Sequence, residues 1–192
     1  MVPADVRGAR KLTRVDLPAH VYPYAVAVVQ DRKAYVSCWN DSSVAVVQEG
    51  KMVARVAVGR HPTAMLLNAQ QTRLYVANSN DDSVSVIDTA TDKELERINV
   101  RLSESVPPGN SPEGLALHGD ELYVANAHSN SVAVVQLKEP RSTVRGFIPT
   151  GQYPSALAVA GGTLFVGNGK GTGFQNSSMV VDNSGRVPNG PN

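Results

Sequence analysis

Residues 61–100 read HPTAMLLNAQQTRLYVANSNDDSVSVIDTATDKELERINV, and the pattern of this stretch recurs along the chain. Two further copies align with it, YPYAVAVVQDRKAYVSCWNDSSVAVVQEGKMVARVAV at residues 22–58 and SPEGLALHGDELYVANAHSNSVAVVQLKEPRSTVRGFIPT at residues 111–150. A fourth copy opens as YPSALAVAGGTLFVGNGKG at residues 153–171 and then loses the pattern. Such a repeat takes precedence over every other signal, because it determines the whole architecture.

The anchor residues of the copies keep a constant spacing. A proline opens each copy, at Pro23, Pro62, Pro112 and Pro154, and an aromatic residue follows, at Tyr35, Tyr75, Tyr123 and Phe165. Nine positions separate the tyrosine from a later valine in three copies: Tyr35 to Val44, Tyr75 to Val84, and Tyr123 to Val132. Constant spacing over three copies indicates one structural unit used repeatedly.

Each copy is predicted to contain four short strands. In residues 61–100 they are approximately Ala64–Leu67, Leu74–Ala77, Ser83–Asp88 and Glu94–Val100, separated by turn residues. The run VAVV at residues 44–47 is apolar on both faces, which suits a sheet packed between two neighbours. About 40 residues and four strands per unit is the spacing of a β-propeller blade. The sequence therefore predicts an all-β propeller of four-stranded antiparallel blades, with three complete blades and a partial fourth.

The repeat divides the chain into consecutive segments. We expect blades at residues 21–60, at 61–110 with an extended linker, and at 111–152, and the start of a fourth blade at 153–171. Residues 1–20 are interpreted as the last strand of a preceding blade (Lys11–Leu17) with its linker, and residues 172–192, rich in Gly, Asn, Ser and Pro, as an irregular insertion or tail.

Several short segments of the repeat resemble those of a known family. LYVAN (74–78) and SVSVIDT (83–89) resemble the YVTN-type, YncE-like propeller repeats of secreted bacterial and archaeal proteins, and the resemblance extends over residues 22–171. HVYPY (20–24), GQYP (151–154) and GNGKG (167–171) are similar to one branch of that family. In that branch the propeller precedes a metal-dependent phosphoesterase domain of the alkaline-phosphatase type.

The resemblance implies several properties of the parent protein. Propellers of this family usually have seven blades, so this chain would be a fragment of one, in the periplasm or outside the cell, with a downstream phosphoesterase domain as one partner. The alternative is that the N-terminal strand completes the fourth blade and closes a four-bladed ring, because closure removes exposed sheet edges.

Composition excludes some classes of function. The formal net charge is +1, from 18 basic and 17 acidic residues, so no strong field attracts nucleic acid or anionic membranes. Aromatic residues make up 5% of the chain, which argues against single-stranded nucleic-acid binding by base stacking. No segment approaches the roughly 20 apolar residues of a membrane span, and the first twenty residues carry too many charges for a signal peptide. The single cysteine, Cys38, excludes an internal disulfide and is expected in the core.

One end of the blades is the predicted ligand face. In an antiparallel meander, the loop after the second strand and the linker to the next blade lie at the same end, and loops on a rigid scaffold usually carry function. The candidate residues on this face are His20, Tyr22, Trp39, Arg60, His61, Asn80, His128, Tyr153, Asn168 and Lys170. Asn and Asp that recur at each turn are explained by backbone capping. Departures from the repeat are therefore the stronger candidates, namely Trp39, His61, His128 and Lys170.

Motifs of catalysis and cofactor binding are absent from the sequence. The four histidines have no i, i+4 pair and no CxxCH motif, so neither a metal site nor a cofactor is predicted. GNGKGTG (167–173) has Leu164 where a P-loop needs its first glycine, and Phe174 where GxGxxG needs its third.

Three hypotheses remain for the function. The first is a non-enzymatic binding or scaffold module that presents the ligand face to a protein, a glycan or another envelope partner. The second is a propeller enzyme of the lactonase kind, or a haem- or quinone-dependent oxidoreductase. The third is single-stranded nucleic-acid binding, which the charge and the aromatic content disfavour.

Overall fold

The computed structural model describes residues 14–103, 105 and 108–171 of the chain. These residues form β-strands and one 3-10 turn, η1 (Trp39–Asp41). Blade 1 consists of β1 (Pro23–Val29), β2 (Lys33–Cys38), β3 (Ser43–Gln48) and β4 (Lys51–Ala57). Blade 2 consists of β5 (Pro62–Leu67), β6 (Arg73–Asn78), β7 (Ser83–Asp88) and β8 (Lys93–Asn99). Blade 3 consists of β9 (Pro112–His118), β10 (Glu121–Asn126), β11 (Ser131–Gln136) and β12 (Thr143–Pro149), and a hairpin follows, β13 (Pro154–Ala160) and β14 (Thr163–Asn168).

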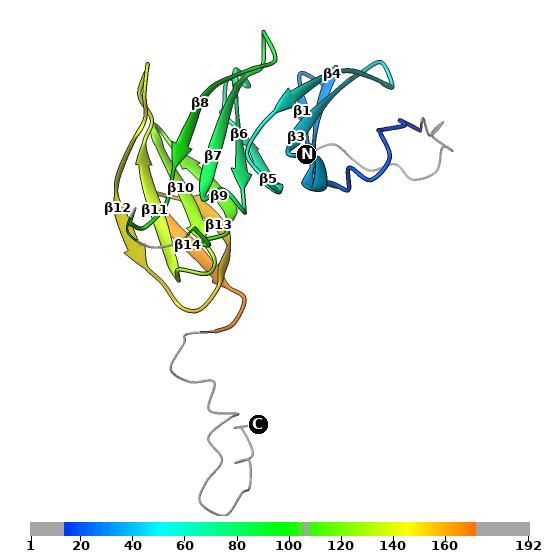
Figure 1. The fold of residues 1–192 in the computed structure, drawn as a ribbon. Coiled ribbons are helices and arrows are strands. Elements are labelled where there is room, and N and C mark those ends of the chain that lie inside the picture. The colour runs from blue at the N-terminus through cyan, green and yellow to red at the C-terminus, as the bar shows by residue number, and fades with distance from the viewer. Residues whose placement is uncertain (1–13, 104, 106–107, 172–192) are drawn as a thin grey trace, which may run out of the picture.

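The strands form three four-stranded antiparallel sheets and one two-stranded sheet, each with its strands in sequence order. The three large sheets stand side by side in Figure 1, from blade 1 in blue and cyan to blade 3 in yellow-green. This arrangement confirms the prediction of an all-β protein with three complete blades and a partial fourth. Blade 1 and the β13–β14 hairpin lie at opposite ends of the arc (Figure 1), so the described residues do not form a closed four-bladed ring.

The regular spacing in the sequence arises from a constant hairpin register. Tyr35 pairs with Val46, Tyr75 with Val86, and Tyr123 with Val134, each between the second and third strands of its blade. Equal registers place the equivalent side chain on the same face of every blade, because successive side chains of a strand point to opposite faces.

The core lies between the blades. One apolar cluster joins Tyr35, Val44 and Val46 of blade 1 to Leu74 and Ile87 of blade 2. A second cluster joins blade 2 to blade 3 in the same way. Val44, Ala45, Val46 and Val47 are all buried, which confirms that the central strands are covered on both faces. Cys38 is buried as expected, and burial raises the pKa of its thiol.

The exposed fraction of the aromatic residue in the second strand shows how well the next blade covers each blade. Tyr35 is 0% exposed and Tyr75 is 5% exposed, whereas Phe165 of β14 is 56% exposed. At the other end of the arc, Val26 and Val28 of β1 are 64% and 48% exposed. Both ends of the described arc therefore present apolar surface.

Parts of the expected organisation fall outside this arc. Residues 14–22 contain no strand, so the expected strand Lys11–Leu17 is not present in its described part, and residues 11–13 lie outside the described residues. The expected tail at 172–192 also lies outside them. No helix within the described ranges has the length and apolar character needed to cross a bilayer.

Candidate functional site

We call one end of the blades the loop face. It comprises the loops after the second strands (39–42, 79–82, 127–130 and 169–171) and the described residues of the linkers into the blades (18–22, 58–61, 100–103, 105, 108–111 and 150–153). The same backbone hydrogen bond recurs in all four units: Trp39 N–H to Tyr22 O at 3.0 Å, Ser79 to His61 at 3.0 Å, Ala127 to Ser111 at 2.9 Å, and Gly169 to Tyr153 at 2.8 Å. Each loop is thereby fixed to the linker of its own blade.

The acceptor in each of these bonds precedes the blade's proline and has a positive φ. The values are 48° at Tyr22, 51° at His61, 53° at Ser111 and 60° at Tyr153. Left-handed backbone is unusual for non-glycine residues and persists only where the surroundings hold it. Because it recurs in every unit, we attribute it to the blade architecture, which presents a different side chain at the same place each time.

Trp39 and His61 form a stacked pair on the loop face. Their ring centroids are 3.9 Å apart and their planes differ by 7°. Trp39 lies in the loop of blade 1 and His61 in the linker to blade 2, so the stack bridges two blades. Nδ1 of His61 is buried and has no hydrogen-bond partner among the described residues.

His128, Tyr153 and Lys170 form a second cluster between blade 3 and the β13–β14 hairpin. The rings of His128 and Tyr153 are 5.6 Å apart at 56°, and the Lys170 ammonium lies 4.5 Å from the Tyr153 ring centroid. Nδ1 of His128 donates to the Gly109 carbonyl oxygen over 3.2 Å. The cluster is a ring platform with an exposed ammonium at its edge.

Arg60 and Asn80 are held together by Asp81. Nε of Arg60 lies 2.6 Å from Oδ1 of Asp81, the Arg60 backbone N–H donates to Oδ2 over 2.8 Å, and Nη2 donates to the Asn80 carbonyl oxygen over 3.0 Å. Burial disfavours the Asp81 carboxylate, but the hydrogen bonds and charge of Arg60 outweigh it and lower the pKa of Asp81. The pair fixes a linker to its loop.

The remaining candidates have less distinctive surroundings. His20 and Tyr22 are exposed, and each uses its carbonyl oxygen as an acceptor, from the Asn40 amide at 3.0 Å and from the Trp39 N–H at 3.0 Å. Asn168 ends β14 as Asn126 ends β10, where the Asn126 amide donates to the Val100 carbonyl oxygen over 2.8 Å. Asn168 therefore occupies the position at which Asn126 has a structural role in blade 3.

Asp82 is a residue of this face that the sequence did not single out. Its side chain is 0% exposed and accepts backbone N–H bonds from Gly109, Asn110 and Ser111 at 2.8, 2.7 and 3.3 Å. Arg101 lies 3.5 Å from the same carboxylate. Asp82 therefore ties the long linker to the loop face. The sequence does carry a signal for this role, because blade 3 has Asn130 at the equivalent position. The Asn130 side chain accepts a hydrogen bond from one linker amide, that of Tyr153.

Three acidic side chains of the loop face are already paired. Asp81 and Asp82 are committed to arginines and backbone amides, and Asp41 lies 3.2 Å from Arg55. Within the described part of the chain, no three His, Cys, Asp or Glu side chains are grouped so that they could hold a metal ion. His20, His128 and Lys170 are exposed on this face.

A comparison with protein-family models found one match, described as lactonase, 7-bladed beta-propeller, over residues 43–146. The matched segment is more than half of the chain. The chain belongs to this lactonase family of seven-bladed β-propellers. A search of curated proteins found no match.

Solved structures share the fold at low sequence identity. Hydrazine synthase from Kuenenia stuttgartiensis is 23% identical with a TM-score of 0.61, and the match covers 75% of this chain and 40% of that one. A Bacteroides fragilis protein described as a candidate 6-phosphogluconolactonase is 16% identical with a TM-score of 0.65, covering 76% and 47%. Virginiamycin B lyase from Staphylococcus aureus is 14% identical with a TM-score of 0.59, covering 78% and 50%. This chain thus spans half or less of the length of these neighbours.

Proposed function

We propose that this segment of a lactonase-family propeller is a binding module that holds its partner on the loop face and carries no catalytic centre of its own. The observation that carries the proposal is the pairing of ring side chains across blade junctions, Trp39 on His61 and His128 beside Tyr153. Trp39, His61 and His128 depart from the repeat, whereas Tyr153 has a tyrosine counterpart at Tyr22.

The chemistry of the face indicates the kind of partner. Flat rings favour partners with apolar or ring-shaped surfaces, and Lys170 adds a cation beside the Tyr153 ring. The acidic side chains Asp81 and Asp82 are already paired with arginines. An acidic glycan of the cell envelope combines rings with carboxylates and suits this face best.

The first test is a titration with oligogalacturonate, with neutral maltohexaose as the control ligand. The fluorescence of the single tryptophan, Trp39, reports binding at the stacked pair. We expect saturable binding of the acidic glycan, weakened about three- to tenfold by Lys170→Ala. Lys51→Ala, an exposed lysine on β4 away from the loop face, is the matched control and should bind as the wild type does. Equal losses in the two variants would refute the placement of the site.

The second candidate function is lactone hydrolysis, which the family match favours. It is distinguished by incubating the chain with glucono-δ-lactone and following acid release. Turnover that disappears in His128→Ala would overturn the non-catalytic part of the proposal.

For the parent protein, we propose an envelope or secreted location and an attached metal-dependent phosphoesterase domain. HVYPY (20–24) and GNGKG (167–171) support this through their similarity to one branch of the YncE-like propellers. The full-length protein should then hydrolyse para-nitrophenyl phosphate, lose that activity on chelation, and be recovered outside the cytoplasm. A coding frame without such a domain would rule it out.

A further inference from the structure

The end of the blades opposite the loop face contains a cleft. It lies between blades 2 and 3, has a volume of about 1030 Å³, and is bordered by the loops after the first and third strands. Its apolar wall includes Leu66, Leu95, Leu117, Leu137 and the ring of Tyr75. Ligand pockets in proteins span about 300–1,000 Å³, so the cleft is large enough for a small molecule.

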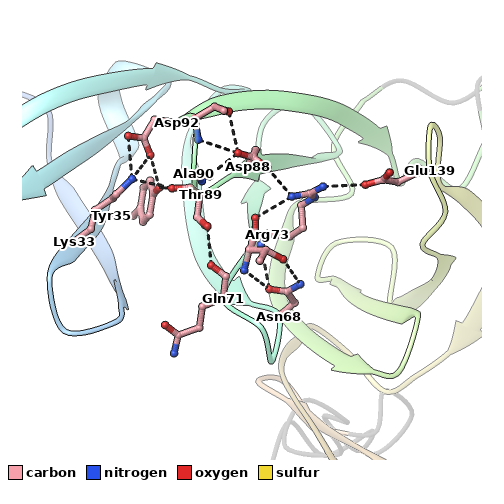
Figure 2. A network of polar contacts seen from close by, with 12 residues as sticks. Lys33, Tyr35, Asn68, Gln71, Arg73, Asp88, Thr89, Ala90, Asp92 and Glu139 are labelled. Atoms are coloured by element: carbon pink, nitrogen blue, oxygen red, sulfur yellow. Dashed lines mark hydrogen bonds and ion pairs between the residues drawn. The ribbon is translucent and has the colours of Figure 1, made fainter.

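At the junction between blades 1 and 2, the corresponding gap is closed by side chains. Nζ of Lys33 donates to Asp92 over 2.9 Å and to the Thr89 carbonyl oxygen over 2.8 Å. The Tyr35 hydroxyl donates to the same Asp92 carboxylate and lies 3.3 Å from the Thr89 carbonyl oxygen. Figure 2 shows these side chains of blade 1 reaching into the turn of blade 2. Both polar groups at this junction are thereby satisfied within the protein.

At the next junction, the equivalent residues are Arg73 and Tyr75, and the contacts differ. Arg73 donates to Asp88 of its own blade over 2.6 Å and to Glu139 of blade 3 over 2.9 Å (Figure 2). The Tyr75 hydroxyl has no hydrogen-bond partner among the described residues, although the residue is 5% exposed. Burial raises the pKa of Tyr75, so the hydroxyl stays protonated at neutral pH.

Loop length accounts for the difference. The loop between the third and fourth strands has four residues in blade 2 (89–92) and six in blade 3 (137–142). Ser142 ends the longer loop and binds the Glu96 carboxylate through its N–H at 2.7 Å and its hydroxyl at 2.8 Å. These bonds fix the loop on β8, and none of its described residues forms a hydrogen bond with the Tyr75 hydroxyl.

The charges of the cleft select among ligands. Its described lining carries the carboxylates of Asp88, Glu96, Asp120 and Glu139 and the cations of Arg73 and Lys138. Arg73 is already paired with two of the carboxylates. An additional cation is therefore favoured, and an anion is disfavoured.

We propose that this cleft binds a small amphipathic amine, with its apolar body against the leucines and its ammonium group donating to the Tyr75 oxygen and facing the carboxylates. The site is separate from the loop face and does not depend on the function proposed for it.

Calorimetric titration of the 192-residue chain with tryptamine tests the proposal. Indole-3-ethanol and indole-3-propionate share its apolar body and replace the amine by a neutral and an acidic group. We expect saturable binding of tryptamine, about tenfold weaker binding of the alcohol, and none of the acid. Equal binding of all three compounds, or no saturable binding of tryptamine, would overturn the proposal.

Two matched variants locate the site. Leu95 on β8 and Val53 on β4 occupy the same position in their blades, and each is 53% exposed, but only Leu95 lines the cleft. Leu95→Lys should weaken tryptamine binding about tenfold, and Val53→Lys should leave it unchanged. Tyr75→Phe should weaken it about two- to tenfold by removing one hydrogen bond. An equal effect of the two lysine variants would show that binding lies elsewhere.

Discussion

Tyr35→Phe should destabilise the folded chain far more than Tyr75→Phe, although each substitution removes the hydroxyl group at the equivalent position of its blade. Tyr35 is fully buried, and its hydroxyl donates to the Asp92 carboxylate beside the Thr89 carbonyl oxygen. A hydrogen bond to a charged group contributes about 1.5–3 kcal/mol, so Tyr35→Phe should lower the free energy of unfolding by about that amount. Lys33 remains on Asp92 in the variant, which limits the loss to the hydroxyl's own bonds.

Tyr75→Phe is the internal control, because this hydroxyl has no protein partner within the described residues. Its free energy of unfolding should stay within about 0.5 kcal/mol of the wild type. Urea denaturation measures both variants, and with a slope of about 2 kcal/mol per molar, Tyr35→Phe should lower the midpoint by about 1 M. Equal midpoints for the two variants would refute the view that one junction is closed by hydrogen bonds and the other is open.

Three further predictions concern charge, the ends of the arc and the long linker. The backbone hydrogen bond from Thr91 and the charge of Arg73 lower the pKa of Asp88. The ionised carboxylate therefore stabilises the folded chain above the ordinary pKa of 3.8, and this contribution is lost as the pH falls through the lower folded pKa. Asp88→Asn should make the urea midpoint depend less on pH in this acidic range. The apolar ends should make the isolated chain self-associate in sedimentation velocity, and Val26→Asp with Phe165→Asp should reduce this while Leu102→Asp, exposed on a linker, should not. Asp82→Ala leaves three linker amides without their acceptor and should lower the free energy of unfolding by about 2–4 kcal/mol, with faster amide exchange in that linker.

The strands and their order were predictable because the repeat encodes them locally. A proline, an aromatic and the next valine occur at fixed distances, so the hairpin register of Tyr75 and Val86 follows from the same pattern as that of Tyr35 and Val46. Strand ends differ by one or two residues, as for the expected Ala64–Leu67, which is Pro62–Leu67 in the structure. Propensity locates a strand well and its ends less well.

Contacts between blades were not predictable from the repeat. The stack of Trp39 on His61 depends on how two sheets are placed side by side, which no local pattern specifies. Asp82 was interpreted only as a turn residue, because capping explains Asp in a turn without reference to a distant linker. The cleft at Tyr75 had a signal, a loop that is two residues longer in blade 3 than in blade 2, but its meaning required the positions of the neighbouring side chains.

The central claim, a partner bound on the loop face without chemical change, is tested most directly by nuclear magnetic resonance. The indole N–H of the single tryptophan gives one resolved signal on that face. Adding oligogalacturonate should shift this signal and those of His128 and Lys170 saturably, and mass spectrometry should recover the glycan unchanged. Shifts confined to the opposite end of the blades, or recovery of a cleaved glycan, would contradict the claim.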